Sequence, residues 1–384
     1  MAKAAVLTAL DTPLEIRTDV EVEPPRAGEV KVRMGASGVC HSDLSMQNGT
    51  IMSAMPVVLG HEGAGVIEEV GEGVTNLKPG DHVVVSWVPQ CGDCFFCVRD
   101  QGELCEKANA AIATGGLLDG TTRFTSGGSP LFQMAASGTF SEVSIIPAIG
   151  AVKIPDDIPL TVAALVGCGV LTGVGAAINT ADIRRGDTVA VIGCGGVGLN
   201  VIQGARIAGA DRIIAIDQVE TKLALAKQFG ATDSVNAGQV DAVGQVMGMT
   251  SQRGADVAFE VIGLGPTIDQ AVNMTRRGGQ TILVGVPRME VSLTVPVFFG
   301  LVLAEKTIKG CWYGSSNVHR DVGKLLDLYR AGDLKLDELI SRTITLDEVN
   351  DAFDAMKTGE VARSVIDYGL ETAGAGGASG RARA

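Results

Sequence analysis

The spacing of apolar and polar positions changes character partway along the chain. Over the first 150 residues, short alternating or β-branched runs are separated by Gly and Pro, a pattern typical of β-strands joined by long loops. The clearest of these runs span residues 29–34, 65–70, 82–86 and 141–146. The first part of the chain is therefore predicted to be a mainly β domain.

From about residue 170 onward, strand-like and helical segments alternate. The strand-like runs cover residues 188–192, 212–217, 255–261 and 280–285, and the helical patterns cover residues 199–208, 220–229 and 267–275. Strands that alternate with helices of about ten residues form βαβ units around a parallel sheet. This part of the chain is predicted to be an α/β domain with a doubly wound parallel sheet.

The segments on either side of this region complete the expected organisation. The most apolar stretch, residues 162–178, contains four glycines and is shorter than the ~20 residues of a membrane span, so we predict a buried core segment. A helix is expected at residues 322–331, after which the chain returns to the first domain. We therefore expect a mainly β domain (1–170), an α/β domain (171–311), a returning segment (312–371) and a disordered tail (372–384) rich in Ala, Gly, Ser and Arg.

Charge and composition restrict the class of partner. Lys and Arg number 31 against 44 Asp and Glu, a net charge of -13, so the surface repels nucleic-acid phosphates and anionic membranes. The N-terminal residues 1–12 lack the basic and apolar segments of a secretory signal. We expect a cytoplasmic protein, in which clustered thiols are more often metal ligands or catalysts than disulfides.

A glycine-rich turn follows the first strand of the α/β domain. The segment Gly193-Cys194-Gly195-Gly196-Val197-Gly198 has G-x-G-x-x-G spacing and opens a helix, and Asp217 ends the next predicted strand. Gly193 permits the tight turn, Gly195 lets the backbone approach a pyrophosphate, and Gly198 allows close packing of helix and strand. The Asp217 carboxylate would accept hydrogen bonds from the ribose hydroxyls and would repel a 2′-phosphate. The pattern predicts a dinucleotide site that prefers NAD to NADP.

Four of the eight cysteines fall in one short segment. Their spacing is Cys91-x2-Cys94-x2-Cys97-x7-Cys105. Four thiolates close a tetrahedral zinc site and leave no position for water or substrate, so this zinc would be structural. An iron-sulfur cluster is the main alternative, although the bacterial ferredoxin pattern has a shorter last gap and a following Pro.

Three further segments carry ligand-type residues. They are Cys40-His41-Ser42-Asp43, Gly60-His61-Glu62 and Gly167-Cys168-Gly169. Two thiolates and one imidazole make a zinc shell with an open fourth position, as in catalytic zinc sites such as that of alcohol dehydrogenase. Local spacing does not pair His61 with Cys168, and a single buried Cys or His is more often a core residue than a ligand.

Taken together, these segments occur in the order found in zinc-dependent medium-chain alcohol dehydrogenases. The chain resembles that family from about residue 5 to about residue 370. The segment Asp119-Gly120-Thr121-Thr122-Arg123-Phe124 is similar to the longer, dimeric branch that includes class I and class III enzymes. The resemblance implies a GroES-like catalytic domain, a Rossmann NAD-binding domain and a homodimer.

The resemblance also assigns residues to the two zinc ions. It implies that Cys40, His61 and Cys168 hold the catalytic zinc, and that the structural zinc is held by Cys91, Cys94, Cys97 and Cys105. Glu62 matches a carboxylate that can approach the metal, and Asp43 matches the partner that orients His61. Ser42 matches the hydroxyl that bonds the substrate oxygen.

For the cofactor, the resemblance places cations and an acid around NAD. His41 and Arg363 match positions near the pyrophosphate, and Asp217 with Lys222 matches the adenosine-ribose site. The remaining contacts would come from the glycine-rich turn, namely Gly193, Gly195, Gly196, Val197 and Gly198. The implied reaction is hydride transfer between a primary alcohol, or its aldehyde, and NAD, with zinc acting as a Lewis acid.

Two positions depart from the relatives. Ser45 stands where class I enzymes often place the histidine that ends a proton relay, and Asn109 stands where class III enzymes hold the carboxylate of a thiol adduct with an arginine. A formaldehyde-thiol adduct is therefore the alternative substrate. A non-catalytic zinc- and NAD-binding sensor is a distant alternative, because Cys40, His61, Cys168 and Ser42 are all present.

Overall fold

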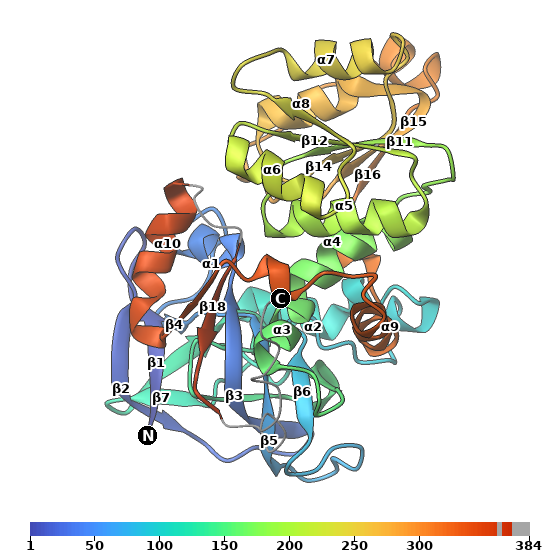
Figure 1. The fold of residues 1–384 in the computed structure, drawn as a ribbon. Helices are drawn as coiled ribbons and strands as arrows, with labels where there is room; N and C mark the ends of the chain where they lie inside the picture. Colours follow the sequence, from blue (N-terminus) through green and yellow to red (C-terminus); the bar gives the residue numbers. More distant parts are fainter. Residues whose placement is uncertain (359–362, 371–384) are drawn as a thin grey trace, which may run out of the picture.

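The chain forms two lobes built on different kinds of sheet (Figure 1). The computed structural model describes residues 1–358 and 363–370. The tail expected at residues 372–384 lies outside the described residues. The mixed α/β architecture agrees with the fold class predicted from the sequence.

The first lobe contains a closed barrel and a seven-stranded sheet. The barrel order is β1 (Ala2–Leu7), β2 (Glu15–Val22), β7 (Phe124–Ser126), β8 (Ser129–Gln133) and β4 (Val57–Val58). The sheet order is β10 (Ala151–Lys153), β6 (His82–Val85), β5 (Glu62–Val70), β3 (Glu29–Val39), β18 (Ser364–Asp367) and β17 (Arg342–Ile344), with β9 (Val143–Pro147) also paired to β3.

Two corrections to the sequence prediction concern this lobe. Strands β3 and β5 are longer than the runs at residues 29–34 and 65–70, because each continues through glycine-rich sequence that lacks a strand pattern. The lobe also contains short helices, α1 (His41–Gln47) and α2 (Glu106–Thr114). Both helices lie in loop regions that carry candidate ligands.

The second lobe is a six-stranded parallel sheet with helices on both faces (Figure 1). The strand order is β13 (Asp233–Asn236), β12 (Arg212–Asp217), β11 (Thr188–Ile192), β14 (Ala255–Glu260), β15 (Thr275–Leu283) and β16 (Thr307–Gly310). The helices are α5 (Gly196–Ala208), α6 (Glu220–Gln228), α7 (Ala242–Met249) and α8 (Gly265–Met274). The order reverses between β11 and β14, where doubly wound sheets bind ligands beyond the carboxyl ends of their strands.

A long apolar helix, Leu160–Thr180, lies where the two lobes meet (Figure 1). It comprises α3 (Leu160–Leu165), a π-helical turn Val166–Val170, α4 (Leu171–Gly175) and a second π-helical turn Ala176–Thr180. By length and composition it could cross a membrane, but 83% of its most apolar window is buried inside the protein. The prediction of a buried segment is confirmed, and the expected division after residue 170 falls inside this helix.

The last part of the chain returns to the first lobe. After α9 (Val318–Arg330) come β17, α10 (Val349–Thr358) and β18. Strand β18 pairs antiparallel with β3, with Ser364 opposite Val39 and Asp367 opposite Ala36. This pairing places Arg363 beside the turn that carries Cys40.

Candidate active site

A single buried carboxylate organises the two turns that carry the first candidate ligands. Strand β3 ends at Val39, and Cys40 is the N-cap of α1. Asp43 Oδ2 accepts the Cys40 N–H at 2.9 Å, and Oδ1 accepts the Gly60 N–H at 3.1 Å. Oδ1 also lies 3.2 Å from His61 Nδ1. Because Asp43 engages Nδ1, the other ring nitrogen of His61 is left for a metal.

The fold brings Cys168 to this pair from the π-helical turn of the long helix. Ligand atoms of Cys40, His61, Glu62 and Cys168 all lie within 4.8 Å of one another, and all four residues are buried. Two thiols, an imidazole and a carboxylate are the donor types of a catalytic zinc site. The residues therefore fit a zinc ion.

Glu62 joins this cluster to a buried cation. Its Oε1 accepts the Gly169 N–H at 3.0 Å and lies 3.0 Å from Arg363 Nη2. Its Oε2 is buried and has no hydrogen-bond partner among the described residues. Burial raises the pKa of Glu62 to about 7, although the Arg363 charge opposes this shift. Glu62 thus offers one uncommitted oxygen beside the candidate ligands.

Ser42 lies next to the same cluster. It is the second residue of α1, and the Cys40 thiol donates to its Oγ at 3.9 Å. Ser45 follows one turn later and is half-buried, as Ser42 is. A hydroxyl therefore stands beside the candidate ligands, and a second hydroxyl lies farther along the helix.

The second cysteine group forms a separate site in the first lobe. The Sγ atoms of Cys91, Cys94, Cys97 and Cys105 lie within 4.8 Å of one another. The thiols come from a loop with two short 3-10 helices, Cys97–Arg99 and Gly102–Leu104. Four converging thiols fit a closed zinc site that holds no substrate.

The glycine-rich turn has the geometry that its spacing predicts. Gly193 has a φ of 99°, and a Cβ on Gly198 would lie 1.8 Å from the Gly193 carbonyl oxygen. Gly195 is the N-cap of α5, and the space that its Cβ would fill is open. A Cβ on Gly196 would meet Arg363 Nε at 2.3 Å. The helix N-terminus and Arg363 together fit a pyrophosphate.

Hydrogen bonds and ion pairs do not join the remaining candidate cofactor residues into one cluster within the described part of the chain. Asp217 accepts backbone N–H groups from Cys194 at 2.9 Å and from Val219 at 3.0 Å. Val197 follows Gly196 in the first turn of α5. His41 is exposed at the start of α1, and Lys222 is half-buried in α6. Among the described residues, no hydrogen bond or ion pair joins Lys222 to Asp217 or His41 to Arg363.

An aromatic group beside His61 was not predicted from the sequence. The ring centroids of Trp87 and His61 are 6.2 Å apart, and Trp87 also packs against Trp312 at 5.1 Å and Tyr313 at 4.6 Å. Both tryptophans of the chain belong to this group. They are 225 positions apart in the sequence, so no local pattern connects them.

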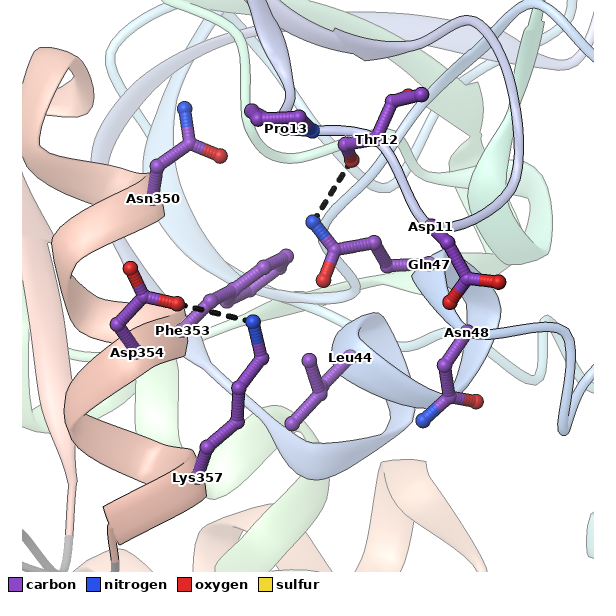
Figure 2. Close-up of a pocket in the computed structure, with 10 residues that line it drawn as sticks. All are labelled: Asp11, Thr12, Pro13, Leu44, Gln47, Asn48, Asn350, Phe353, Asp354 and Lys357. Carbon is purple, nitrogen blue, oxygen red and sulfur yellow. Dashed lines mark hydrogen bonds and ion pairs between the residues drawn. The ribbon is translucent and has the colours of Figure 1, made fainter.

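A pocket of about 330 Å³ lies on another part of the first lobe, beside the C-terminal half of α1 (Figure 2). Its polar groups engage one another or the backbone: Gln47 donates to the Thr12 carbonyl at 2.9 Å, and Lys357 pairs with Asp354 at 2.9 Å. None of the candidate metal or cofactor residues lines it. The pocket is therefore distinct from the assembled ligand cluster.

Comparisons with known proteins agree with this geometry. Residues 26–156 match the alcohol dehydrogenase GroES-like domain, and residues 196–330 match the zinc-binding dehydrogenase family. The chain is therefore a zinc-binding dehydrogenase of the alcohol dehydrogenase type.

Full-length relatives define the family more closely. The chain is 42% identical over 372 residues to the NDMA-dependent alcohol dehydrogenase of Amycolatopsis methanolica, covering 96% of this chain and 99% of the relative. It is 40% identical over 370 residues to the S-(hydroxymethyl)glutathione dehydrogenase of Escherichia coli O1:K1, covering 96% and 100%. The crystal structure of an alcohol dehydrogenase zinc-binding domain protein from Burkholderia ambifaria superposes with a TM-score of 0.90 at 34% identity, covering 95% and 98%. The chain belongs to the zinc-dependent medium-chain alcohol dehydrogenase family, and it is an alcohol oxidoreductase.

Proposed function

We propose that the protein oxidises a primary alcohol to its aldehyde with NAD, and catalyses the reverse reaction, at the cluster of Cys40, His61 and Cys168. The observation that carries this proposal is the position of Arg363. Its guanidinium pairs with Glu62 beside the ligand cluster and lies against Gly196 in the glycine-rich turn. Metal and cofactor sites that share one side chain can hold alcohol and nicotinamide in contact.

Bound zinc supplies a Lewis acid that lowers the pKa of the alcohol hydroxyl, and bound NAD accepts the hydride. Asp43 holds the Cys40 and His61 turns in register for the metal. Ser42 Oγ would accept the proton of the alcohol while the hydroxyl of Ser42 passes its own proton onward. Since Ser45 follows where a histidine would end a relay, the proton leaves to water.

We propose that positively charged groups hold the pyrophosphate of the cofactor and that a carboxylate holds its adenosine ribose. The N-terminus of α5 and Arg363 neutralise the pyrophosphate, and Lys222 adds positive charge nearby. Desolvation lowers the pKa of His41, so His41 binds the pyrophosphate as a neutral ring that donates a hydrogen bond. The Asp217 carboxylate accepts hydrogen bonds from the ribose hydroxyls of NAD and repels the 2′-phosphate of NADP. We propose two zinc ions per chain, the second held by Cys91, Cys94, Cys97 and Cys105 to stabilise the lobe.

The proposed assembly is a cytoplasmic homodimer. The π-helical segment Val297–Val302 exposes apolar side chains, with Phe299 71% exposed, and precedes β16, the edge strand of the parallel sheet, in the chain. An exposed sheet edge beside an apolar surface favours pairing with a second copy. The division of the chain at residues 170 and 311 into catalytic and NAD-binding parts belongs to the same proposal.

The experiment that tests the reaction is a steady-state survey with NAD and with NADP. The substrates are primary alcohols, their aldehydes, and formaldehyde with several thiols. The proposal predicts turnover of simple alcohols with NAD and no requirement for a thiol. Activity that appears only with a formaldehyde-thiol adduct would establish the alternative substrate, which the uncharged Asn109 side chain disfavours. Absence of hydride transfer with every substrate would overturn the proposal.

A further inference from the structure

The return of the chain from the parallel sheet to the first lobe is marked by an unusual turn. Tyr313, Gly314 and Ser315 have φ values of 52°, 67° and 48°. Left-handed backbone is strained at the two non-glycine residues of this turn, Tyr313 and Ser315, and persists only where the surroundings hold it. Such strain is concentrated at functional sites, so the contacts of this turn are informative.

The turn is fixed against the long apolar helix at several points. Asn179 Nδ2 donates to the Gly314 carbonyl at 3.2 Å, and the Ser315 and Thr180 hydroxyls lie 2.8 Å apart. A Cβ on Gly314 would lie 2.2 Å from the Leu171 carbonyl oxygen. The turn and the helix that carries Cys168 therefore form one closely packed unit.

The strained conformation directs the Tyr313 side chain into the first lobe. Tyr313 is 2% exposed. Its hydroxyl donates to the Gly167 carbonyl and lies 3.3 Å from Ser86 Oγ. Gly167 directly precedes Cys168 in the π-helical turn, and π-helical turns often occur at functional sites. The hydroxyl thus holds the backbone of the residue next to a candidate metal ligand.

The Tyr313 ring also supports the opposite side of the cluster. It packs at 4.6 Å against Trp87, whose ring contacts His61 edge-on. One side chain therefore reaches the cysteine side of the cluster through a hydrogen bond and the histidine side through an aromatic ring.

We infer that Tyr313 is a positioning residue that sets the geometry of the catalytic zinc site by fixing Gly167 and Trp87. This inference rests on the proposed assignment of Cys40, His61 and Cys168 as ligands of the catalytic zinc. Within the described part of the chain, the Tyr313 hydroxyl bonds to Gly167 and Ser86 and not to a candidate ligand atom, and we assign it no part in proton transfer. Groups outside the ligand shell affect metal affinity by roughly 10- to 100-fold in other metalloproteins.

The test is Tyr313→Phe, which keeps the ring against Trp87 and removes only the hydroxyl. We expect a chelating dye to remove the catalytic zinc about 10-fold faster than from the wild type. The visible absorption of protein carrying cobalt at this site should shift, and the dissociation constant for NAD should stay unchanged. Tyr329→Phe is the matched control, because its hydroxyl binds Asp337 at the surface, 2.9 Å away. The control should behave as the wild type.

If Tyr313→Phe folds poorly, a second variant tests the same inference. Asn179→Ala releases the strained turn without changing Tyr313, and should shift both readouts in the same direction by a smaller amount. Unchanged zinc release and cobalt absorption in either folded variant would overturn the inference while leaving the proposed function intact. A wild-type chain that binds zinc only at the four-cysteine site would overturn both.

Discussion

Asp43 joins the two turns that carry Cys40 and His61 in the candidate active site. Its two oxygens engage the backbone at Cys40 and Gly60 and the ring of His61, in a fully buried position. The sequence indicated Asp43 only through resemblance. The structure adds the physical reason, which is that one carboxylate holds both turns.

Asp43→Asn should weaken the proposed catalytic zinc site without abolishing folding. The amide keeps the size of the carboxylate but turns one acceptor into a donor, which would face a backbone N–H. We expect zinc affinity at this site to fall roughly 10- to 100-fold and the free energy of unfolding to fall by about 1–3 kcal/mol. Zinc titration and denaturant unfolding measure the two effects. Asp354→Asn, at an exposed surface pair with Lys357, should change neither, and an equal loss in both variants would contradict the role of Asp43.

Asp217→Ala tests cofactor selection at a single carboxylate. Loss of a charged acceptor should weaken NAD binding by about 10-fold, and removal of the negative charge should relieve part of the rejection of NADP. The ratio of the two dissociation constants separates these effects, because mere loosening of the loop would weaken both cofactors equally. Asp211→Ala, an exposed acid that precedes β12, is the control. An unchanged ratio in Asp217→Ala would exclude the proposed selection.

At the scale of elements, the sequence correctly predicted strands that have a regular apolar pattern and a residue that clearly ends them. Strands β11 and β12 match the predicted bounds, because each is a short apolar run. Gly193 follows the last residue of β11, and Asp217 is the last residue of β12. Strand β13, with sequence DSVN, and the exposed strand β16 were missed, since neither carries an apolar pattern. The aromatic group and the strained turn at Tyr313 were missed for another reason: their contacts join segments far apart in the sequence.

The loop before β7 is held by a buried cation, and this makes its stability depend on pH. Arg123 is fully buried and pairs with Glu29 and with Asp119. Although burial opposes it, the hydrogen bond from Arg123 lowers the pKa of Asp119 to about 2. A carboxyl with a lowered pKa stabilises the fold above its ordinary value of 3.8, and this contribution is lost as the pH falls toward 2.

Asp119→Asn should therefore lower stability at neutral pH but not in strong acid. Because the Asp119 side chain is 42% exposed, solvent screening limits the loss to about 1 kcal/mol. Thermal unfolding from pH 7 down to pH 3 should show a constant gap between variant and wild type above pH 5, narrowing below about pH 4. Asp347→Asn is the matched comparison, because the exposed Asp347 carboxylate pairs with Lys3 at the surface and not with a buried cation. A gap independent of pH in Asp119→Asn would argue against its ion pair with Arg123.

On the scale of the whole molecule, the candidate active site depends on contacts between distant parts of the chain. The long helix contributes Cys168, β18 delivers Arg363 beside Cys40, and the glycine-rich turn lies against Arg363 from the other lobe. Local spacing predicted the glycine-rich turn and the four-cysteine group, whose members are close in sequence. It could not join His61 to Cys168, which only the family resemblance linked before the fold was known.

Phe299→Glu tests the proposed dimer. A charge placed in the apolar surface of Val297–Val302 should oppose association with a second copy, because the carboxylate would lose water at the interface. We expect sedimentation velocity to show a monomer for the variant and a dimer for the wild type. Val240→Glu changes an apolar side chain that is 43% exposed elsewhere on the same lobe and should remain dimeric. A monomeric wild type would exclude the assembly.

The most direct test of the central claim is the zinc content of the wild type and of Cys168→Ser, measured together with alcohol turnover. The account predicts two zinc ions per wild-type chain, and one zinc, no turnover and retained NAD binding in Cys168→Ser. Cys97→Ser should instead lose the structural zinc and unfold at a lower temperature. One zinc in both the wild type and Cys168→Ser, or full turnover in Cys168→Ser, would contradict the assignment of Cys40, His61 and Cys168 as the catalytic site.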